Sequence, residues 1–207
     1  MIFIQHRVNS YSDLQKIPTN HGIEVDVRYH HSKLILHHDP LNHHLNKPFE
    51  LKTLLQHWES DSPIILNVKT EGIELLCIEM MNKFNIKNWF FLDISMPFMV
   101  KFSLEAEKKS LTGFSSENLA VRFSEFEPIE YALSFQGRVS WVWVDCFNKF
   151  PLTSSIYSKI KKASFKICLV SPELQNHSLD LIKDFKSQIL EMNIDAICTK
   201  RPDLWIV

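Results

Sequence analysis

The sequence predicts an α/β fold, a compact (β/α)8 TIM barrel in which eight parallel strands alternate with helices. Short runs rich in Val, Ile, Phe and Trp recur about every 25 residues, with helical patterns between them. At 207 residues the chain is near the short end of the range for this fold, so we expect short loops and one domain over residues 1–207. An open, doubly wound sheet is the alternative, but no glycine-rich phosphate loop follows an early strand.

Apolar runs, helical periodicity and the positions of proline set the expected elements. The strands are expected at residues 2–7, 22–27, 63–69, 89–95, 119–124, 139–147, 165–171 and 196–199. The helices are expected at residues 12–17, 49–58, 71–84, 97–108, 128–133, 154–163, 179–192 and 202–205. An additional extended segment, residues 33–38, is expected to form a short hairpin with the second strand.

Composition and charge narrow the functional classes. With 45% hydrophobic residues the chain can bury a substantial core, and its net charge of −1 gives no general reason to bind nucleic acid or an anionic membrane. No apolar run is long enough to span a membrane and no signal peptide is visible, so we expect a cytoplasmic protein without stable membrane insertion. The four cysteines are far apart and form no CxxC pair, which favours buried free thiols.

Two carboxylates lie side by side on the second predicted strand. Because side chains alternate along a strand, Glu24 and Asp26 share one face, and Ile23, Val25 and Val27 share the other. Paired carboxylates repel each other and are costly to bury, so an inward-facing pair implies a cation between them. Oxygen ligands suit Mg²⁺, Ca²⁺ or Mn²⁺ better than zinc. The alternative is that the pair faces water on a solvated edge.

Polar residues follow most of the predicted strands at their C-terminal ends, where barrel enzymes build their active sites. They are His6 and Arg7, Glu24 and Asp26, Asn67 and Lys69, Asp93 and Ser95, Arg122 and Ser124, Asp145, Ser171 and Glu173, and Thr199. Helix capping explains serine and threonine at such positions, but it does not explain the charged residues of the first three strands. Asp145 is either a substrate contact or a helix cap, and Trp141 and Trp143 either stack on substrate or belong to the core.

The order of these polar residues resembles a known pattern. His6-Arg7, Glu24-x-Asp26, His38-Asp39-Pro40 and Asn67-x-Lys69 are similar to the signature of the glycerophosphodiester phosphodiesterase family, which belongs with the phosphatidylinositol-specific phospholipase C-like barrels. Residues 195–203 also resemble that family's last strand and the Pro-Asp turn after it. The likeness runs through nearly the whole chain and is densest in residues 6–69.

The resemblance implies a metal-assisted phosphodiesterase of lipid metabolism that acts on glycerophosphodiester-like or polyol phosphate diesters. It implies His6 and His38 as general acid and base, in an order that the sequence leaves open. The implied ligands of one divalent cation, Mg²⁺ or Ca²⁺, are Glu24, Asp26 and Asn67, and the implied phosphate-binding residues are Arg7 and Lys69. Further candidate substrate contacts are Asp93, Arg122, Trp143 and Asp145.

Two departures from the family pattern leave other functions open. Val8 stands where the family has Gly, and Asn67 stands where it has a third metal carboxylate, so we expect weaker cation binding. The alternatives are a barrel that binds a phosphorylated ligand without turnover and a phospholipid-cleaving lyase of the same fold. The lyase needs an exposed apolar rim, for which Phe147 and Phe150 are candidates. The histidine doublets between residues 30 and 44 are a candidate zinc site, although they lack HxH or HExxH spacing.

Overall fold

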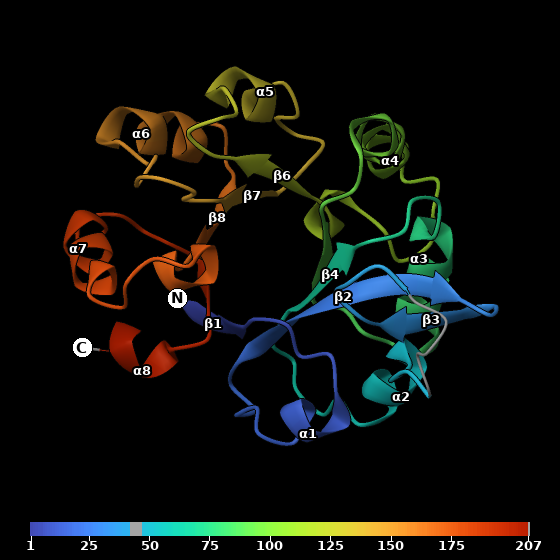
Figure 1. Ribbon diagram of the computed structural model, residues 1–207. Coiled ribbons are helices and arrows are strands. Elements are labelled where there is room, and N and C mark those ends of the chain that lie inside the picture. The colour runs from blue at the N-terminus through green and yellow to red at the C-terminus, as the bar shows by residue number, and fades with distance from the viewer. Residues whose placement is uncertain (42–46, 207) are drawn as a thin grey trace.

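Eight parallel strands form a ring with the helices outside it in a computed structural model that describes residues 1–41 and 47–206 (Figure 1). The strand order around the ring is β5-β4-β2-β1-β9-β8-β7-β6, and β3 pairs with β2 alone. The strands are β1 (Ile2–Gln5), β2 (Gly22–His30), β3 (Lys33–Leu36), β4 (Ile64–Val68), β5 (Trp89–Leu92), β6 (Ala120–Phe123), β7 (Trp141–Val144), β8 (Lys166–Val170) and β9 (Ala196–Thr199). The prediction of a (β/α)8 barrel is confirmed, and the open doubly wound alternative is wrong.

The ring closes between β5 and β6 through a single parallel backbone bridge from Phe91 to Leu119. The side-chain amide of Asn118, which is 5% exposed, donates a hydrogen bond of 2.9 Å to the Trp89 carbonyl across the same junction. This bond satisfies a backbone acceptor that a regular ladder would otherwise pair, so the amide completes the barrel where strand pairing is sparse.

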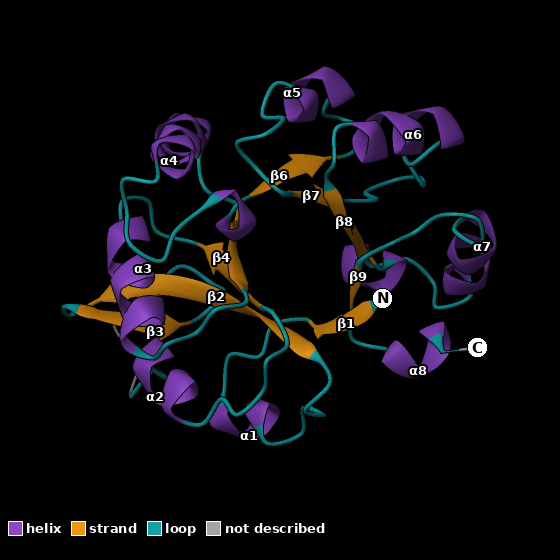
Figure 2. Ribbon diagram, turned by 180° about the vertical axis from the view of Figure 1, so that it is seen from behind, coloured by secondary structure: helices purple, strands orange, loops and turns teal. Residues whose placement is uncertain are grey.

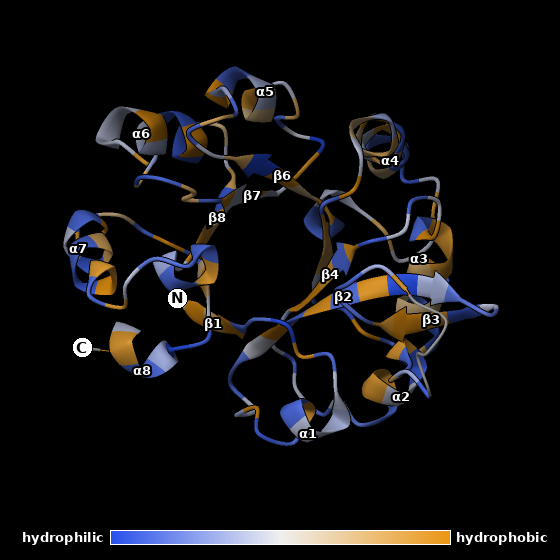
Figure 3. Ribbon diagram, viewed as in Figure 1, coloured by the Kyte–Doolittle hydropathy of each residue, from blue (hydrophilic) through white to orange (hydrophobic). Residues whose placement is uncertain are grey.

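The helices surround the ring (Figure 2), and hydrophobic and hydrophilic residues are interspersed along them (Figure 3). They are α1 (Tyr11–Leu14), α2 (Leu51–Gln56), α3 (Glu74–Lys83), α4 (Met96–Lys108), α5 (Ile129–Leu133), α6 (Ser154–Lys162), α7 (Leu181–Gln188) and α8 (Pro202–Trp205), with 3₁₀ turns at Ser116–Asn118 and Pro172–Gln175. Each predicted element is present, with shifts at its ends. The largest extension is in β2, which continues to His30 because its last residues pair antiparallel with β3.

Side-chain alternation divides the buried residues into two sets. Outward-facing residues such as Ile23 and Val25 pack against the helices, and inward-facing residues such as Ile65, Phe90 and Trp141 fill the barrel. Burying each of these large side chains contributes about 1.5–3 kcal/mol, so the barrel interior is itself a packed core. The inward-facing polar side chains Glu24, Asp26 and Asn67 lie above this core, toward the C-terminal ends of their strands.

The four cysteines are buried free thiols, as predicted. Burial in apolar surroundings raises the pKa of the Cys77 thiol, so it stays protonated and unreactive at neutral pH. In the described ranges, no helix is both long enough and apolar enough to cross a membrane.

Candidate active site

Glu24 and Asp26 point into the barrel from β2, and both are 0% exposed. The alternative of a solvated edge is therefore wrong. On the neighbouring strand β4, Asn67 is the register partner of Asp26, and its Nδ2 donates to Oε1 of Glu24 at 2.8 Å. Asn67, which stands where the resembled pattern has a carboxylate, can also donate a hydrogen bond, and this reduces the repulsion inside the cluster.

The loop between β1 and α1 wraps around the acidic pair. Arg7 has a left-handed backbone (φ 58°), and this turn directs its N–H to Oε2 of Glu24 at 2.8 Å. Val8, which replaces the family's glycine, is buried and donates its N–H to the Glu24 carbonyl at 2.9 Å. Asn9 makes two bonds to Asp26, donating Nδ2 to Oδ2 at 2.7 Å and accepting the Asp26 N–H at 2.9 Å. The sequence analysis did not identify Asn9, because its role depends on the path of this loop.

The acidic cluster has features that suit a hard cation. Burial and the neighbouring Asp26 carboxylate raise the pKa of Glu24 to about 7, against the hydrogen bonds from Asn67 and Arg7 that lower it. Oδ1 of Asp26 and Oδ1 of Asn67 are buried and have no hydrogen-bond partner. Within residues 1–41 and 47–206, no group of three His, Cys, Asp or Glu side chains is arranged to hold a metal ion. The oxygen atoms gathered here come from two carboxylates and one amide, which carry fewer charges than three carboxylates would.

His6 directly follows the C-terminal end of β1, and its Nε2 lies 3.8 Å from Oε2 of Glu24. Its Nδ1 is buried without a hydrogen-bond partner. Burial, and after it the nearby cations Arg7 and Lys200, lower the pKa of His6 to about 3. The imidazole of the ligand-free protein is consequently neutral at physiological pH.

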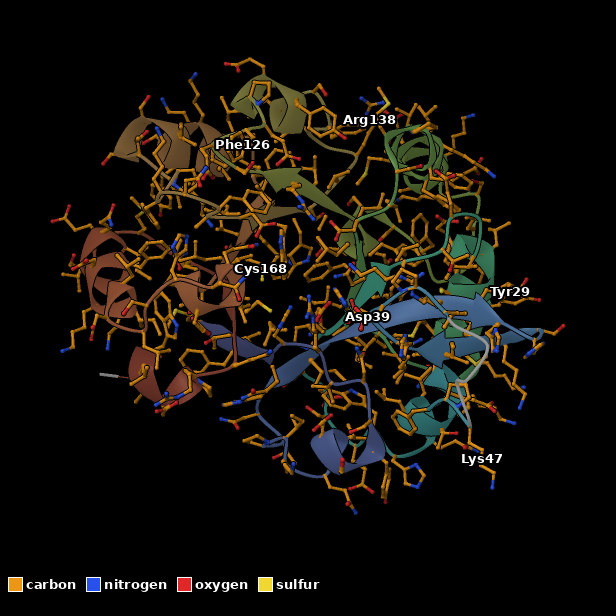
Figure 4. All side chains as sticks on the ribbon, in the orientation of Figure 1. Tyr29, Asp39, Lys47, Phe126, Arg138 and Cys168 are labelled. Atoms are coloured by element: carbon orange, nitrogen blue, oxygen red, sulfur yellow. The ribbon has the colours of Figure 1, made fainter. Side chains whose placement is uncertain are left out.

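His38 follows β3 and contacts the same arginine. Its Nε2 lies 2.7 Å from Nη2 of Arg7, and its Nδ1 lies 2.8 Å from Oδ1 of Asp39. A guanidinium can only donate, so Nε2 accepts and the proton resides on Nδ1, which donates to Asp39. This bond lowers the pKa of the Asp39 carboxyl. Figure 4 labels Asp39 close to β2, toward the middle of the ring.

Arg28 holds the loops that carry two of the predicted site residues. Its guanidinium donates to three backbone carbonyls, those of His37 at 3.1 Å, His38 at 2.8 Å and Lys69 at 3.0 Å. The sequence analysis did not identify this residue. The signal was present, because Arg28 continues the alternation of Glu24 and Asp26 by one further step.

A row of alternating charges crosses the strand ends. The Lys69 ammonium lies 3.6 Å from Oδ1 of Asp26 and 3.5 Å from Oδ2 of Asp93. Asp93 also pairs with Arg122, whose Nη1 lies 3.3 Å from Oδ2 of Asp145. Each cation is therefore held between two carboxylates, which fixes its position.

Asp145 is held by its neighbours above the barrel core. It is 3% exposed and accepts hydrogen bonds from Trp143 Nε1 at 3.1 Å and Gln175 Nε2 at 2.8 Å. Burial raises the pKa of its carboxyl, and Arg122 opposes this shift. The cap of the following helix α6 is Thr153, so the prediction that Asp145 could be a helix cap is wrong. Trp143 is 4% exposed inside the barrel, which favours its interpretation as a core residue.

The aromatic rim differs from the predicted one. Phe150 packs inward on Phe185, with ring centroids 4.9 Å apart, so its prediction as a rim residue is wrong. Phe126, which no sequence pattern indicates, is 68% exposed (Figure 4). Its ring centroid lies 6.0 Å from the ring centroid of Phe147. Of the predicted histidine doublets, His43-His44 lies outside the described residues.

No family model and no curated protein matches the sequence. A solved structure of a glycerophosphodiester phosphodiesterase from Agrobacterium tumefaciens matches with a TM-score of 0.67, covering 99% of this chain and 97% of that one at 14% identity. The chain has the glycerophosphodiester phosphodiesterase fold. A glycerophosphoryl diester phosphodiesterase from Parabacteroides distasonis matches with a TM-score of 0.66 at 11% identity, covering 99% of this chain and 84% of that one. At these identities the likeness concerns the fold, so the chemistry has to be argued from the site residues themselves.

Proposed function

We propose that the protein hydrolyses phosphodiesters of the glycerophosphodiester or polyol phosphate class, assisted by one divalent cation, Mg²⁺ or Ca²⁺. The observation that carries this proposal is the buried pair Glu24 and Asp26, which lies beside His6 and Arg7 at the strand ends. A buried acidic pair is costly to maintain without a function, and it is surrounded by the acid–base and cationic groups that phosphodiester cleavage needs. The names of the two similar structures agree with this reaction class.

Arg7 and Lys69 bind the substrate phosphate in this proposal. In the ligand-free protein Nη2 of Arg7 donates to Nε2 of His38. A phosphate oxygen is a stronger acceptor and matches the planar guanidinium fork, so substrate draws Arg7 away from the imidazole. Binding thereby frees Nε2 of His38 for proton transfer.

His6 acts as the base and His38 as the acid. Because burial and neighbouring cations keep His6 neutral, its imidazole can accept the proton of the attacking hydroxyl. That hydroxyl belongs either to the substrate itself, which gives a cyclic phosphate, or to water. Once released from Arg7, His38 binds a proton at Nε2, since Asp39 stabilises the imidazolium through Nδ1, and it passes this proton to the leaving alkoxide.

Glu24, Asp26 and Asn67 would hold the cation, which would act as a Lewis acid on the non-bridging phosphate oxygens. Asn67 contributes no charge, and the Lys69 ammonium already lies 3.6 Å from Oδ1 of Asp26. Both features weaken cation binding, so millimolar concentrations are appropriate in assays.

Hydrolysis of glycerophosphocholine and bis(p-nitrophenyl) phosphate with added Mg²⁺ or Ca²⁺ tests the proposal. We expect His6→Ala and His38→Ala each to lower kcat by roughly 10²–10⁴-fold, as loss of an acid or base does. The matched control is His57→Ala, because His57 is exposed and its Nδ1 bonds to the Thr53 carbonyl of α2, away from the strand ends. Turnover that survives both active-site substitutions would contradict the assignment.

A phosphate-binding barrel without turnover is the second candidate. It is favoured by the bond from Asn67 to Glu24, which stabilises the acidic cluster without a cation. Saturable binding of phosphodiesters with no hydrolysis under any divalent cation would support it. A phospholipid-cleaving lyase is a third candidate because Phe126 is exposed at the rim, and binding to phosphatidylinositol liposomes tests it.

A further inference from the structure

A basic cavity lies beside the proposed catalytic residues. It occupies about 380 Å³ between the loop that follows β1 and the loop that follows β9. Its charged lining consists of Arg7, Lys16, Lys200 and Asp13, and His6 also lines it. Because His6 and Arg7 belong to the proposed active site as well, a ligand bound there lies next to this cavity.

The charge of this cavity is positive, with three cations against one carboxylate. Asp13 accepts a hydrogen bond from Ser10 Oγ at 2.5 Å, and Ser10 caps α1 by accepting the Asp13 N–H. The Lys16 ammonium lies 3.9 Å from Asp13, a weak and exposed pair. The carboxylate therefore neutralises only part of the positive charge.

Lys200 provides the clearest unsatisfied charge. In the described part of the chain, no carboxylate oxygen lies within 4 Å of its ammonium, whereas the adjacent Arg201 makes two bonds to Asp203 at 2.9 and 2.7 Å. The backbone of Lys200 is nevertheless fixed, because its N–H donates to Oε1 of Glu173 at 3.0 Å. The side chain thus extends from an anchored position as a cation that is available to a ligand.

We propose that this cavity binds a second anionic group of the substrate, a phosphomonoester or carboxylate carried on the alcohol portion of the phosphodiester. This inference rests on the proposed function, because it assumes a phosphodiester at His6 and Arg7. Lys16 and Lys200 supply the attraction, since together with Arg7 they raise the positive potential of the cavity. Substrates with a cationic head group, such as glycerophosphocholine, are disfavoured for the same reason.

The test compares two linear ligands that differ by one phosphate, glycerophosphoglycerol and its terminal phosphomonoester. Binding is measured by calorimetry in His38→Ala protein with Mg²⁺, so that neither ligand is consumed. We expect the phosphorylated ligand to bind about tenfold more tightly, and Lys200→Gln or Lys16→Gln to reduce this ratio several-fold. The control is Lys87→Gln, which removes an exposed charge just before β5, at the opposite end of the barrel.

The outcomes separate the two proposals. Equal affinity for both ligands, or a ratio that Lys200→Gln and Lys87→Gln change equally, would overturn the second anion site. A preserved preference for the phosphorylated ligand, together with no hydrolysis of either ligand by the wild-type protein, would overturn the enzymatic proposal and leave the anion site standing.

Discussion

Nη2 of Arg28 donates a hydrogen bond of 2.8 Å to the backbone carbonyl of His38. The same guanidinium reaches the Lys69 carbonyl at 3.0 Å, so one side chain links the end of the β2–β3 hairpin to the end of β4. The proposed acid and one proposed phosphate-binding residue are therefore positioned by a cation that touches no reacting group. This relationship makes Arg28 a positioning residue for the proposed reaction.

Arg28→Met should lower kcat/KM for glycerophosphocholine by about 10–100-fold, because both loops lose their shared anchor. Arg28→Lys should recover part of this loss, since one ammonium can still reach one of the carbonyls. Kinetics with urea unfolding on the same samples check this. Arg138→Met is the control, because Arg138 donates to a single exposed carbonyl, that of Ser134. A fall in stability without a fall in kcat/KM would contradict the positioning role.

Asn67→Asp should strengthen cation binding and lower the stability of the cation-free protein. The substitution adds a third carboxylate beside Glu24 and removes the amide donor of the 2.8 Å bond. In EDTA we expect a Tm lower by about 5 °C, which corresponds to roughly 1–2 kcal/mol at this chain length. In Mg²⁺ or Ca²⁺ we expect at least a tenfold lower Kd for the ion, measured by calorimetry. An unchanged Kd would indicate that this side chain does not reach the cation.

His21 should make stability depend on pH. It is 8% exposed, and its Nδ1 accepts a hydrogen bond from Gln5 at 3.1 Å. Burial lowers the pKa of His21 in the folded state, so the unfolded chain binds a proton more readily. Its stabilising contribution is therefore complete above pH 6.5, the unfolded value, and is lost as the pH falls below it. The difference between the urea midpoints of wild type and His21→Gln should shrink as the pH is lowered from about 8 to about 5. A constant gap would contradict this.

Arg122 and Asp145 should stabilise the barrel through their interaction with each other. Arg122→Met removes the cation from Asp145, which is 3% exposed, and should cost about 2–3 kcal/mol. Arg122→Met combined with Asp145→Asn should recover much of this loss, because no buried charge then remains unpaired. Urea unfolding of the two single variants and the double variant measures the coupling. If the stability losses of the two single variants simply add in the double variant, the coupling between Arg122 and Asp145 is contradicted.

The fold was predictable because periodicity two on strands and periodicity 3.6 on helices are local signals. Ile23 and Val25 face outward, as the alternation predicts, and Glu24 faces inward among polar groups. The predicted hairpin after the second strand is also present, because the polar turn between residues 30 and 33 separates two apolar runs.

The details of the site depend on loop conformation, which local patterns do not encode. Arg7 and Asp93 both adopt positive φ, which is uncommon for residues other than glycine, and these turns direct their groups toward Glu24 and Arg122. Asn9 was not identified because it lies outside every strand, and its partner Asp26 is distant in sequence. The inward packing of Phe150 depends on Phe185, which belongs to a helix far along the chain.

The junction between β5 and β6 has a consequence for how the molecule opens. One backbone bridge, one amide side chain and the Asp93–Arg122 ion pair span it, whereas the junction between β2 and β4 is paired along five residues. Thermal fluctuations should therefore admit water through this seam first, and amide hydrogens along β6 should exchange sooner than those of β2. Glu24 and Asp26 lie on β2, at its well-paired junction with β4. Local opening between β5 and β6 should therefore leave this buried acidic pair in place.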